Sequence, residues 1–372
     1  MIFTSRVMIN SMKLMPSNNT PALFGLNPSN TNKDFREAKA WGKNSFNNCF
    51  PIALLCYMQS QNTAPVYLTV DEKWNIVPEK IDVNSIFGHA YDSEDIFFGF
   101  ESTYGQSQRL VKGTLPRIDL VVMDTSDSES PWLRALEIKL TTLPDNSTCD
   151  FSEEEYGCEL VVRPNTIIHL TLEIVSQYAE HQSELSDSLR PIFHNNFNWE
   201  SENSMLEEIP HIIQIIRTLL LAKIDDQLPL VIQPIWKTIG KSSRLHENCL
   251  DVFVWSTFAF AKLLLDTVEQ GRSRKFSRAK RAVLWMVKML SDFATDGKID
   301  PQTVSVGFTR QTDKAFALSG RKTHPYMSCA ELSRPRIKKT EIKNIILGQG
   351  EKLLSPERRF DAILVNSPEL FT

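Results

Sequence analysis

This chain of 372 residues lacks the cysteine and histidine patterns that hold zinc in many proteins. Its six cysteines are scattered with no Cys-x-x-Cys pair, and its seven histidines form no His-Glu-x-x-His sequence. A zinc ribbon and a metalloprotease of that type are therefore excluded. Scattered cysteines in a chain of this size also argue against a disulfide framework, so we expect reduced thiols.

Other signatures are missing as well. There is no glycine-rich phosphate loop and no Gly-x-Ser-x-Gly elbow. The N-terminus lacks the apolar core of a signal peptide. The longest mostly apolar stretch, Val252 to Leu265, is too short to span a bilayer, and we interpret it as a buried helix. We therefore predict a cytoplasmic protein with no membrane partner.

Charge is distributed unevenly along the chain. Residues 271–343 contain 17 Lys or Arg against 6 Asp or Glu, an excess of 11 positive charges. The net charge of the whole chain is −4, so the remaining residues carry −15. Such asymmetry favours a polyanionic partner more strongly than the overall charge does.

The order of expected elements indicates an α/β protein with a mixed central β-sheet flanked by helices. Strands are expected at residues 66–70, 76–77, 109–112, 118–123, 132–142, 230–238 and 360–365. Residues 99–104 are expected to be irregular, the strand at 109–112 to pair with the one at 118–123, and Pro234 to mark an edge or a bulge. Helices are expected from Asp34 towards Gly42, from Pro51, from Pro164, at 205–223 with an interruption or start at Pro210, at 250–269 and at 277–293.

The chain divides into three predicted parts. Residues 1–33 are rich in Asn, Ser, Pro and Thr and form a loose arm. Residues 34–245 form a catalytic core. Residues 246–372 form a helical and basic region that completes the core and binds DNA.

Ionisable residues inside two apolar strands are the most informative feature of the sequence. Asp119 opens the run Ile118–Met123, and Glu137 and Lys139 lie within Leu133–Thr141. Side chains alternate along a strand, so Glu137 and Lys139 share a face with Ala135, whereas Leu136 and Ile138 point into a core. If the strands are neighbours, Asp119 and Glu137 reach one point in space.

Two carboxylates and a backbone carbonyl make an oxygen site that suits Mg²⁺. Such an ion lowers the pKa of a bound water that can attack a phosphodiester. Lys139 can orient that water, help to deprotonate it or neutralise charge on the phosphorus, and the sequence does not choose among these roles. The alternative is that Glu137 and Lys139 form an exposed ion pair on a solvated sheet face. Asp124 rivals Asp119 as the first ligand, and Glu101 is a possible accessory acid.

Basic residues form two clusters in the last third of the chain. Phosphate contacts need such cations, and arginine can also bind guanine edges. The alternative for either cluster is a solvated surface. Because the chain also has a candidate phosphodiesterase site, we predict that both clusters bind DNA. The first consists of Arg272, Arg274, Lys275, Arg278, Lys280 and Arg281, and the second of Arg334, Arg336, Lys338 and Lys339.

The pattern Asp119…Glu137-x-Lys139 resembles the motif of PD-(D/E)XK nucleases, although the proline stands three residues before the acid. Three further segments are similar to HindVP-type type II restriction endonucleases: PALFGL at 21–26, WGKNSFNNCFP at 41–51 and ELVVRP at 159–164. Lys43 and Asn44 fall in the second of these and are candidate DNA contacts, and the roles of Trp41 and Phe46 stay open between DNA contact, packing and dimerisation. The similarity covers roughly residues 20–240.

The resemblance implies a restriction-endonuclease-like core and a homodimeric, Mg²⁺-dependent enzyme that cuts both strands of double-stranded DNA at a short palindrome. The site associated with such enzymes is GRCGYC, and a cognate DNA methyltransferase protects the host. Asp119, Glu137 and Lys139 are the catalytic positions that it implies. The alternatives are a repair or recombination nuclease with the same core and a non-catalytic DNA-binding protein with a degenerate core.

Overall fold

The structure is a computed structural model, and it describes residues 51–52, 54–59, 61–139, 141–143, 159–193, 197–239, 244–245, 248–249, 252–270, 276–304, 316–319 and 337–338. The predicted N-terminal arm, a helix expected from Asp34 and a strand expected at 360–365 lie outside these residues. Within the described residues, no helix combines the length and the apolar character needed to cross a membrane.

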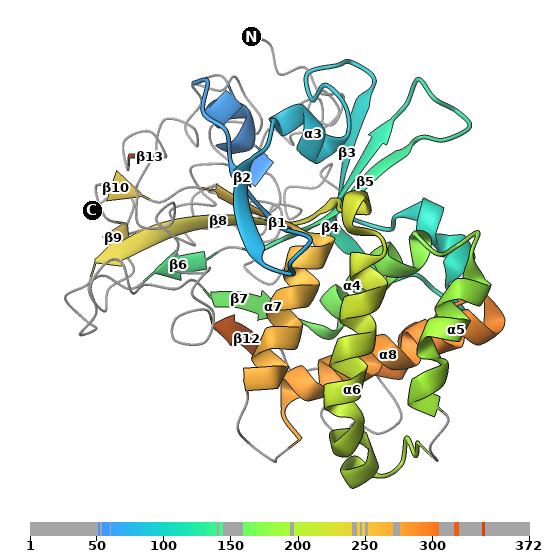
Figure 1. The fold of residues 1–372 in the computed structure, drawn as a ribbon. Coiled ribbons are helices and arrows are strands. Elements are labelled where there is room, and N and C mark those ends of the chain that lie inside the picture. Colours follow the sequence, from blue (N-terminus) through green and yellow to red (C-terminus); the bar gives the residue numbers. More distant parts are fainter. Residues whose placement is uncertain are drawn as a thin grey trace, which may run out of the picture.

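A mixed β-sheet forms the centre of the molecule (Figure 1). The β1–β11 and β5–β8 pairs are parallel, and the other pairs along the sheet are antiparallel. This confirms the predicted α/β class. The strand order is β2 (Ile76–Lys80), β1 (Val66–Val70), β11 (Val252–Ser256), β8 (Pro229–Ile239), β5 (Trp132–Ile138), β4 (Ile118–Asp124) and β3 (Ile96–Ser102).

Shorter strands extend this arrangement. β6 (Thr141–Leu143) and β9 (Arg244–Leu245) both pair with β8. Two separate ladders join distant parts of the sequence: β7 (Glu159–Val162) pairs with β12 (Phe316–Ser319), and β10 (Asn248–Cys249) pairs with β13 (Ile337–Lys338).

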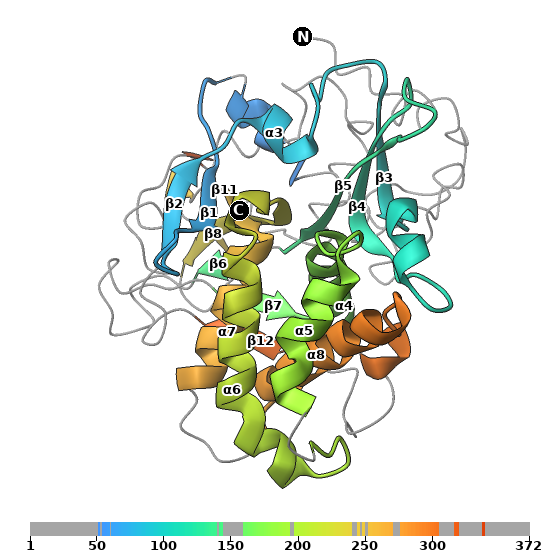
Figure 2. The ribbon, with the colours of Figure 1, turned by 45° about the vertical axis from the view of Figure 1, so that its right-hand side comes forward.

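Helices cover both faces of the sheet. On one face, Val66 and Leu68 join a large apolar core with the helices drawn below the sheet in Figures 1 and 2. On the other face, Tyr67 packs in a second core with helical residues between 51 and 59 and with α3 (Val83–Phe87). The larger helices are α4 (Pro164–Ser176), α5 (Gln182–Phe193), α6 (Glu202–Leu221), α7 (Thr257–Gln270) and α8 (Arg278–Asp296), and the 3₁₀ turns are η3 (Gly105–Leu110), η5 (Ile224–Asp226) and η6 (Pro301–Val304).

The prediction of one helix over 250–269 was wrong in its first part. Val252–Ser256 is β11, a fully buried strand between β1 and β8, and the helix begins only at Thr257. A continuous apolar run carries no periodicity that distinguishes a buried strand from a buried helix. Phe253 and Trp255 pack in the large core, and Val252 and Val254 pack in the second core on the opposite face of the sheet. Apolar partners on both sides therefore select the strand.

Three further predictions were wrong. The segment 99–104 is irregular only after Ser102, because β3 runs to that residue and is the partner of β4. Arg109–Lys112 is not that partner, since residues 105–110 form a 3₁₀ helix. Pro210 neither starts nor interrupts α6.

Pro234 lies within the sheet, not at its edge. It pairs in register with Val252, and its neighbour on the other side changes from β5 at Ile232 to β6 at Ile235. A residue that lacks an N–H group is tolerated where the neighbouring strand is interrupted.

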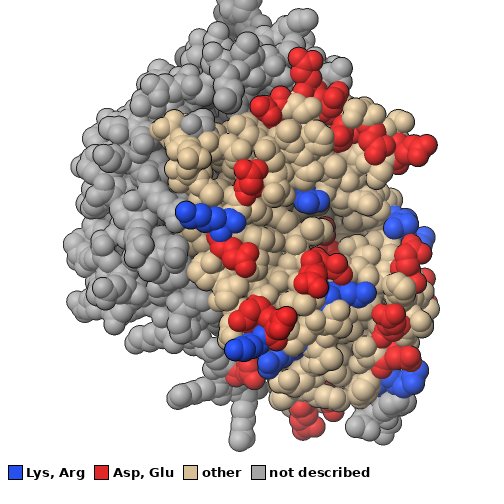
Figure 3. Space-filling view, turned by 45° about the horizontal axis from the view of Figure 1, so that its top comes forward, with Lys and Arg blue, Asp and Glu red and all other residues tan. Residues whose placement is uncertain are grey.

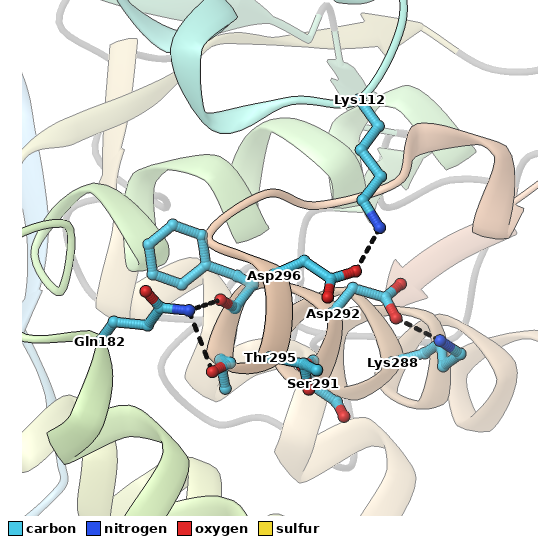
Figure 4. Close-up of polar contacts among 9 residues, drawn as sticks. Lys112, Gln182, Lys288, Ser291, Asp292, Thr295 and Asp296 are labelled. Atoms are coloured by element: carbon cyan, nitrogen blue, oxygen red, sulfur yellow. Dashed lines mark hydrogen bonds and ion pairs between the residues drawn. The ribbon is translucent and has the colours of Figure 1, made fainter.

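The C-terminal end of α8 holds the segment that leads into β4. The backbone N–H of Ile299 donates to Leu110 O, and that of Lys112 donates to Ile299 O, both at 2.8 Å. Lys112 forms an ion pair with Asp296 at the last turn of α8 (Figure 4). Gln182 of α5 caps the same end, since its Nε2 donates to Phe293 O at 2.8 Å and to Ala294 O at 3.0 Å.

We expect Gln182→Ala to lower the free energy of unfolding by about 1–2 kcal/mol, because two carbonyls at the end of α8 lose their part-buried donor. Urea denaturation measures this change. Gln108→Ala is the matched control, since Gln108 Nε2 donates to Gly113 O at 2.9 Å in an exposed setting. Its effect is expected to stay below about 0.5 kcal/mol, and equal losses in the two variants would contradict a capping role for Gln182.

Candidate active site

The register of β4 and β5 brings Asp119 and Glu137 together. Leu120 pairs with Leu136 and Val121 with Ala135, so the next position along this antiparallel pair sets Asp119 opposite Glu137. Both side chains lie on the face of the sheet that carries Val121 and Ala135. The predicted convergence of these two side chains is therefore present in the structure.

At this point β5 changes its partner. Its ladder with β4 ends at Leu136, and from Glu137 it pairs in parallel with β8. The Asp119 side chain takes the place of backbone pairing on the β4 side, because its Oδ2 accepts a hydrogen bond of 2.8 Å from the N–H of Ile138. The N–H of Lys139 donates to Ile232 O of β8 at 2.9 Å.

Lys139 and Glu137 form a buried ion pair. The ammonium of Lys139 donates to Oε1 of Glu137, and the residues are only 9% and 7% exposed. This burial excludes the alternative of a solvated surface pair. Burying two charges is at best neutral for stability, so the pair needs a reason other than folding.

The surroundings of the two acids shift their pKa values in opposite directions. Burial raises the pKa of Asp119 to about 7, and the negative charge of Glu137 acts in the same direction. Burial also opposes ionisation of Glu137, but the positive charge of Lys139 and the hydrogen bonds from Lys139 and Thr166 outweigh it and hold the pKa of Glu137 below its ordinary value. Glu137 is therefore the more acidic partner.

The two other candidate acids lie in different places. Phe100 and Ser102 pair with Leu120 and Ile118, so Glu101 lies opposite Asp119 on β3. Its negative charge contributes to the raised pKa of Asp119, and its φ of 48° is rare outside glycine and enriched at functional sites. Asp124 ends β4 five residues away, where its Oδ1 accepts hydrogen bonds from Ser126.

The two carboxylates fit a hard cation. Among the described residues, Asp119 Oδ1 and Glu137 Oε2 have no hydrogen-bond partner, since the bonds fall on Oδ2 and Oε1. Carboxylate oxygens are ligands that Mg²⁺ prefers, and that ion keeps several waters. No cluster of three or more His, Cys, Asp or Glu side chains suited to a metal occurs in the part of the chain that the structure describes. A cation held by Asp119 and Glu137 would take its other ligands from water, backbone carbonyls or phosphate.

The candidate DNA contacts are mostly outside the described residues. This holds for Lys43, Asn44, Arg272, Arg274, Lys275, Arg334, Arg336 and Lys339, and Lys338 is described only as backbone of β13. The described ones are Arg278, Lys280 and Arg281, at the first turn of α8.

These three residues lie far along α8 from the segment that leads to Asp119. The last turn of α8 contacts Lys112, and a helix of 19 residues is about 28 Å long. On the face shown in Figure 3, acidic side chains gather along the upper edge and basic ones are scattered. The described part of that face therefore presents no continuous basic surface.

Sequence reasoning missed two polar residues beside the carboxylates. Thr166 and His169 of α4 are 1% and 3% exposed. Thr166 Oγ1 donates to Glu137 Oε1 at 3.1 Å, and His169 Nε2 lies 3.2 Å from Arg117 O. Their signal in the sequence is polar residues spaced by three in a helix that is otherwise largely apolar.

Comparisons against known proteins identify the family of the chain. A family model described as HindVP restriction endonuclease matches residues 41–371. The chain belongs to the HindVP restriction endonuclease family. It is 43% identical to the type II restriction enzyme HgiDI of Herpetosiphon aurantiacus over 355 residues, which cover 95% of this chain and 98% of that one.

A second relative of this restriction endonuclease is the probable type II restriction enzyme HindVP of Haemophilus influenzae. The two are 37% identical over 354 residues, covering 94% of this chain and 95% of that one. No solved structure matches the chain. The resemblance inferred from the sequence segments is thus confirmed at the level of the family.

Proposed function

We propose that this restriction endonuclease cuts both strands of a short palindromic DNA sequence in an Mg²⁺-dependent reaction of the PD-(D/E)XK type. Asp119, Glu137 and Lys139 are its catalytic residues. The observation that carries the proposal is the convergence of the two carboxylates where β5 leaves β4 for β8, with Lys139 paired to Glu137.

Each residue has a chemical task in this proposal. Asp119 Oδ1 and Glu137 Oε2 hold the cation, and Glu101, opposite Asp119, is an accessory acid. Bound Mg²⁺ supplies a water of lowered pKa and offsets charge on the phosphate. Lys139 adds a positive charge beside the scissile group, where a fixed charge lowers the barrier because it needs no reorganisation.

The proposed partners follow from the type of cut. A palindrome has two-fold symmetry, so a homodimer with one centre per chain matches it. The basic clusters neutralise DNA phosphates. A nuclease with a short site also needs a DNA methyltransferase that protects the genome of its host. The family resemblance supports GRCGYC as the recognition sequence.

Digestion of a mapped plasmid tests the proposal. We expect discrete fragments in the presence of Mg²⁺ and none in excess EDTA, since the two carboxylates do not by themselves activate a water molecule. Sequencing the fragment ends gives the recognition site and the cut position, and sedimentation of the protein with a duplex that holds one site gives the number of chains bound.

Three other results would contradict parts of the proposal. A smear or nicks at branched structures would favour a repair or recombination nuclease. DNA binding with no cutting under any divalent ion would favour a non-catalytic protein. Discrete fragments with ends outside GRCGYC would replace the recognition sequence alone.

A further inference from the structure

Helix α4 carries a stripe of polar side chains on its face toward the catalytic strands. Thr166, His169 and Glu173 are spaced by three and four residues, which places them on one side of the helix. Their neighbours Ile167, Ile168 and Leu170 are buried and apolar. A buried polar group costs free energy unless it is hydrogen-bonded, so the partners of this stripe need an explanation.

Thr166 is bonded so that its one proton faces Glu137. The N–H of Arg163 donates to Thr166 Oγ1 at 3.3 Å and occupies a lone pair of the hydroxyl. The hydroxyl proton is then donated to Glu137 Oε1 at 3.1 Å, because an ionised carboxylate only accepts. Since Lys139 donates to the same oxygen, Oε1 carries both hydrogen bonds and Oε2 is left for another ligand.

His169 holds the strand that carries the other acid. Its Nε2 lies 3.2 Å from the carbonyl oxygen of Arg117, two residues before Asp119. A carbonyl can only accept, so Nε2 carries the proton in this contact. Burial lowers the pKa of His169, which keeps the ring neutral near pH 7 and suits a donor to a carbonyl. Successive turns of α4 thus contact Glu137 of β5 and the residue that precedes β4.

We propose that Thr166 and His169 are positioning residues for the nuclease centre: Thr166 fixes which oxygen of Glu137 faces the cation, and His169 fixes the start of β4 and hence Asp119. This inference rests on the proposed function. A purely structural role would require only that the two polar groups be satisfied, and it predicts no effect on cation binding. Partners behind metal ligands are worth about 10–100-fold in metal affinity or activity.

Thr166→Val removes the hydroxyl and keeps the shape of the side chain. We expect it to raise the Mg²⁺ concentration for half-maximal cleavage by about 10–100-fold. It should weaken Ca²⁺ binding to the protein–DNA complex, measured by calorimetry without cleavage, by a similar factor. Thr166→Ser should restore both values, because it keeps the donor.

Thr171→Val is the matched control. Thr171 lies on the same helix, is fully buried, and its Oγ1 donates to Ile167 O of its own helix at 2.8 Å. Its substitution should leave both cation measurements unchanged. If Thr166→Val and Thr171→Val give the same Mg²⁺ and Ca²⁺ values, the positioning role of Thr166 is wrong.

A second pair of variants covers the case in which Thr166→Val does not fold. His169→Gln keeps a side-chain N–H donor and His169→Leu does not, so the leucine variant should bind Ca²⁺ more weakly than the glutamine variant. Equal binding by these two would overturn the role of His169. If the wild-type protein neither binds Ca²⁺ in its DNA complex nor cuts with Mg²⁺, the proposed function fails and this inference fails with it. If the wild type does both, equal variants overturn the inference alone.

Discussion

Lys139→Ala is expected to lower the rate of Mg²⁺-dependent DNA cleavage by about 10²–10³-fold or more, the cost of removing one fixed group that stabilises a transition state. Lys139 is buried and donates to Glu137, so no other described side chain takes over its charge at that oxygen. Single-turnover cleavage of a plasmid that holds one site measures the loss. Survival of Mg²⁺-dependent cutting in this variant would show that the candidate centre is wrong.

Removing Lys139 also leaves the buried charge of Glu137 without its partner, which destabilises the fold, and a control must separate this effect from the loss of catalysis. Lys262 and Asp266 form a part-buried ion pair on α7, with side chains 12% exposed each. Lys262→Ala removes a comparable lysine outside the candidate centre. It is expected to cost stability, measured as a lower Tm, while single-turnover cleavage at 25 °C stays within about twofold of wild type.

Asp119→Asn is expected to abolish cleavage and, at the same time, to raise the Tm of the metal-free protein at pH 8 by about 2–4 °C. Burial and the charge of Glu137 raise the pKa of Asp119 to about 7, whereas an unfolded Asp titrates near 4. The folded state therefore holds this proton more tightly than the unfolded state. Protonated Asp119 contributes its full stability below about pH 4, and this contribution is lost as the pH rises to about 7. At pH 8 the wild type therefore bears the full cost of burying the ionised carboxylate.

Thermal unfolding at pH 5 and pH 8 tests this sign, and the advantage of Asp119→Asn should be smaller at pH 5. Asn keeps an oxygen that accepts the N–H of Ile138. Asp71→Asn is a control with the opposite expected sign, because hydrogen bonds from Asn75 lower the pKa of Asp71. Removing this carboxylate should destabilise the protein at pH 8. Addition of Ca²⁺ should raise the Tm of the wild type and leave that of Asp119→Asn unchanged. A Tm for Asp119→Asn below that of the wild type at pH 8 would contradict the claim that ionised Asp119 destabilises the metal-free protein.

The arrangement of Asp119, Glu137 and Lys139 could be predicted from the sequence because it depends on local rules. Alternation along two short strands fixes which side chains share a face, and the turn between the strands makes them neighbours. The positions that the structure gives to Leu136 and Ile138, in the core on the opposite face, follow from the same rule. Burial of Glu137 and Lys139 depends on α4 and β8, which lie far along the chain, so the sequence left the exposed alternative open.

The errors concern features that only tertiary packing decides. Val252–Ser256 could not be distinguished from a helix until β1 and β8 were known to flank it. β3 contains Gly99 and the left-handed Glu101, which weaken any strand pattern, yet it pairs with β4 over its whole length. Thr166 and His169 attract no attention in a largely apolar helix until their partners are visible. The DNA-contacting role of the basic clusters stays a prediction.

The order of strands has a consequence for how the protein is made. The hairpin β1–β2 and the meander β3–β4–β5 are each continuous in sequence, but β8 and β11 lie between them in the sheet. In a chain still growing on the ribosome, these two pieces are therefore not joined into one sheet until about residue 256 has emerged. The strand that carries Glu137 lacks its second neighbour, β8, until about residue 239 has emerged, and up to that length the nascent protein has no finished centre with which to attack the DNA of the cell that is producing it.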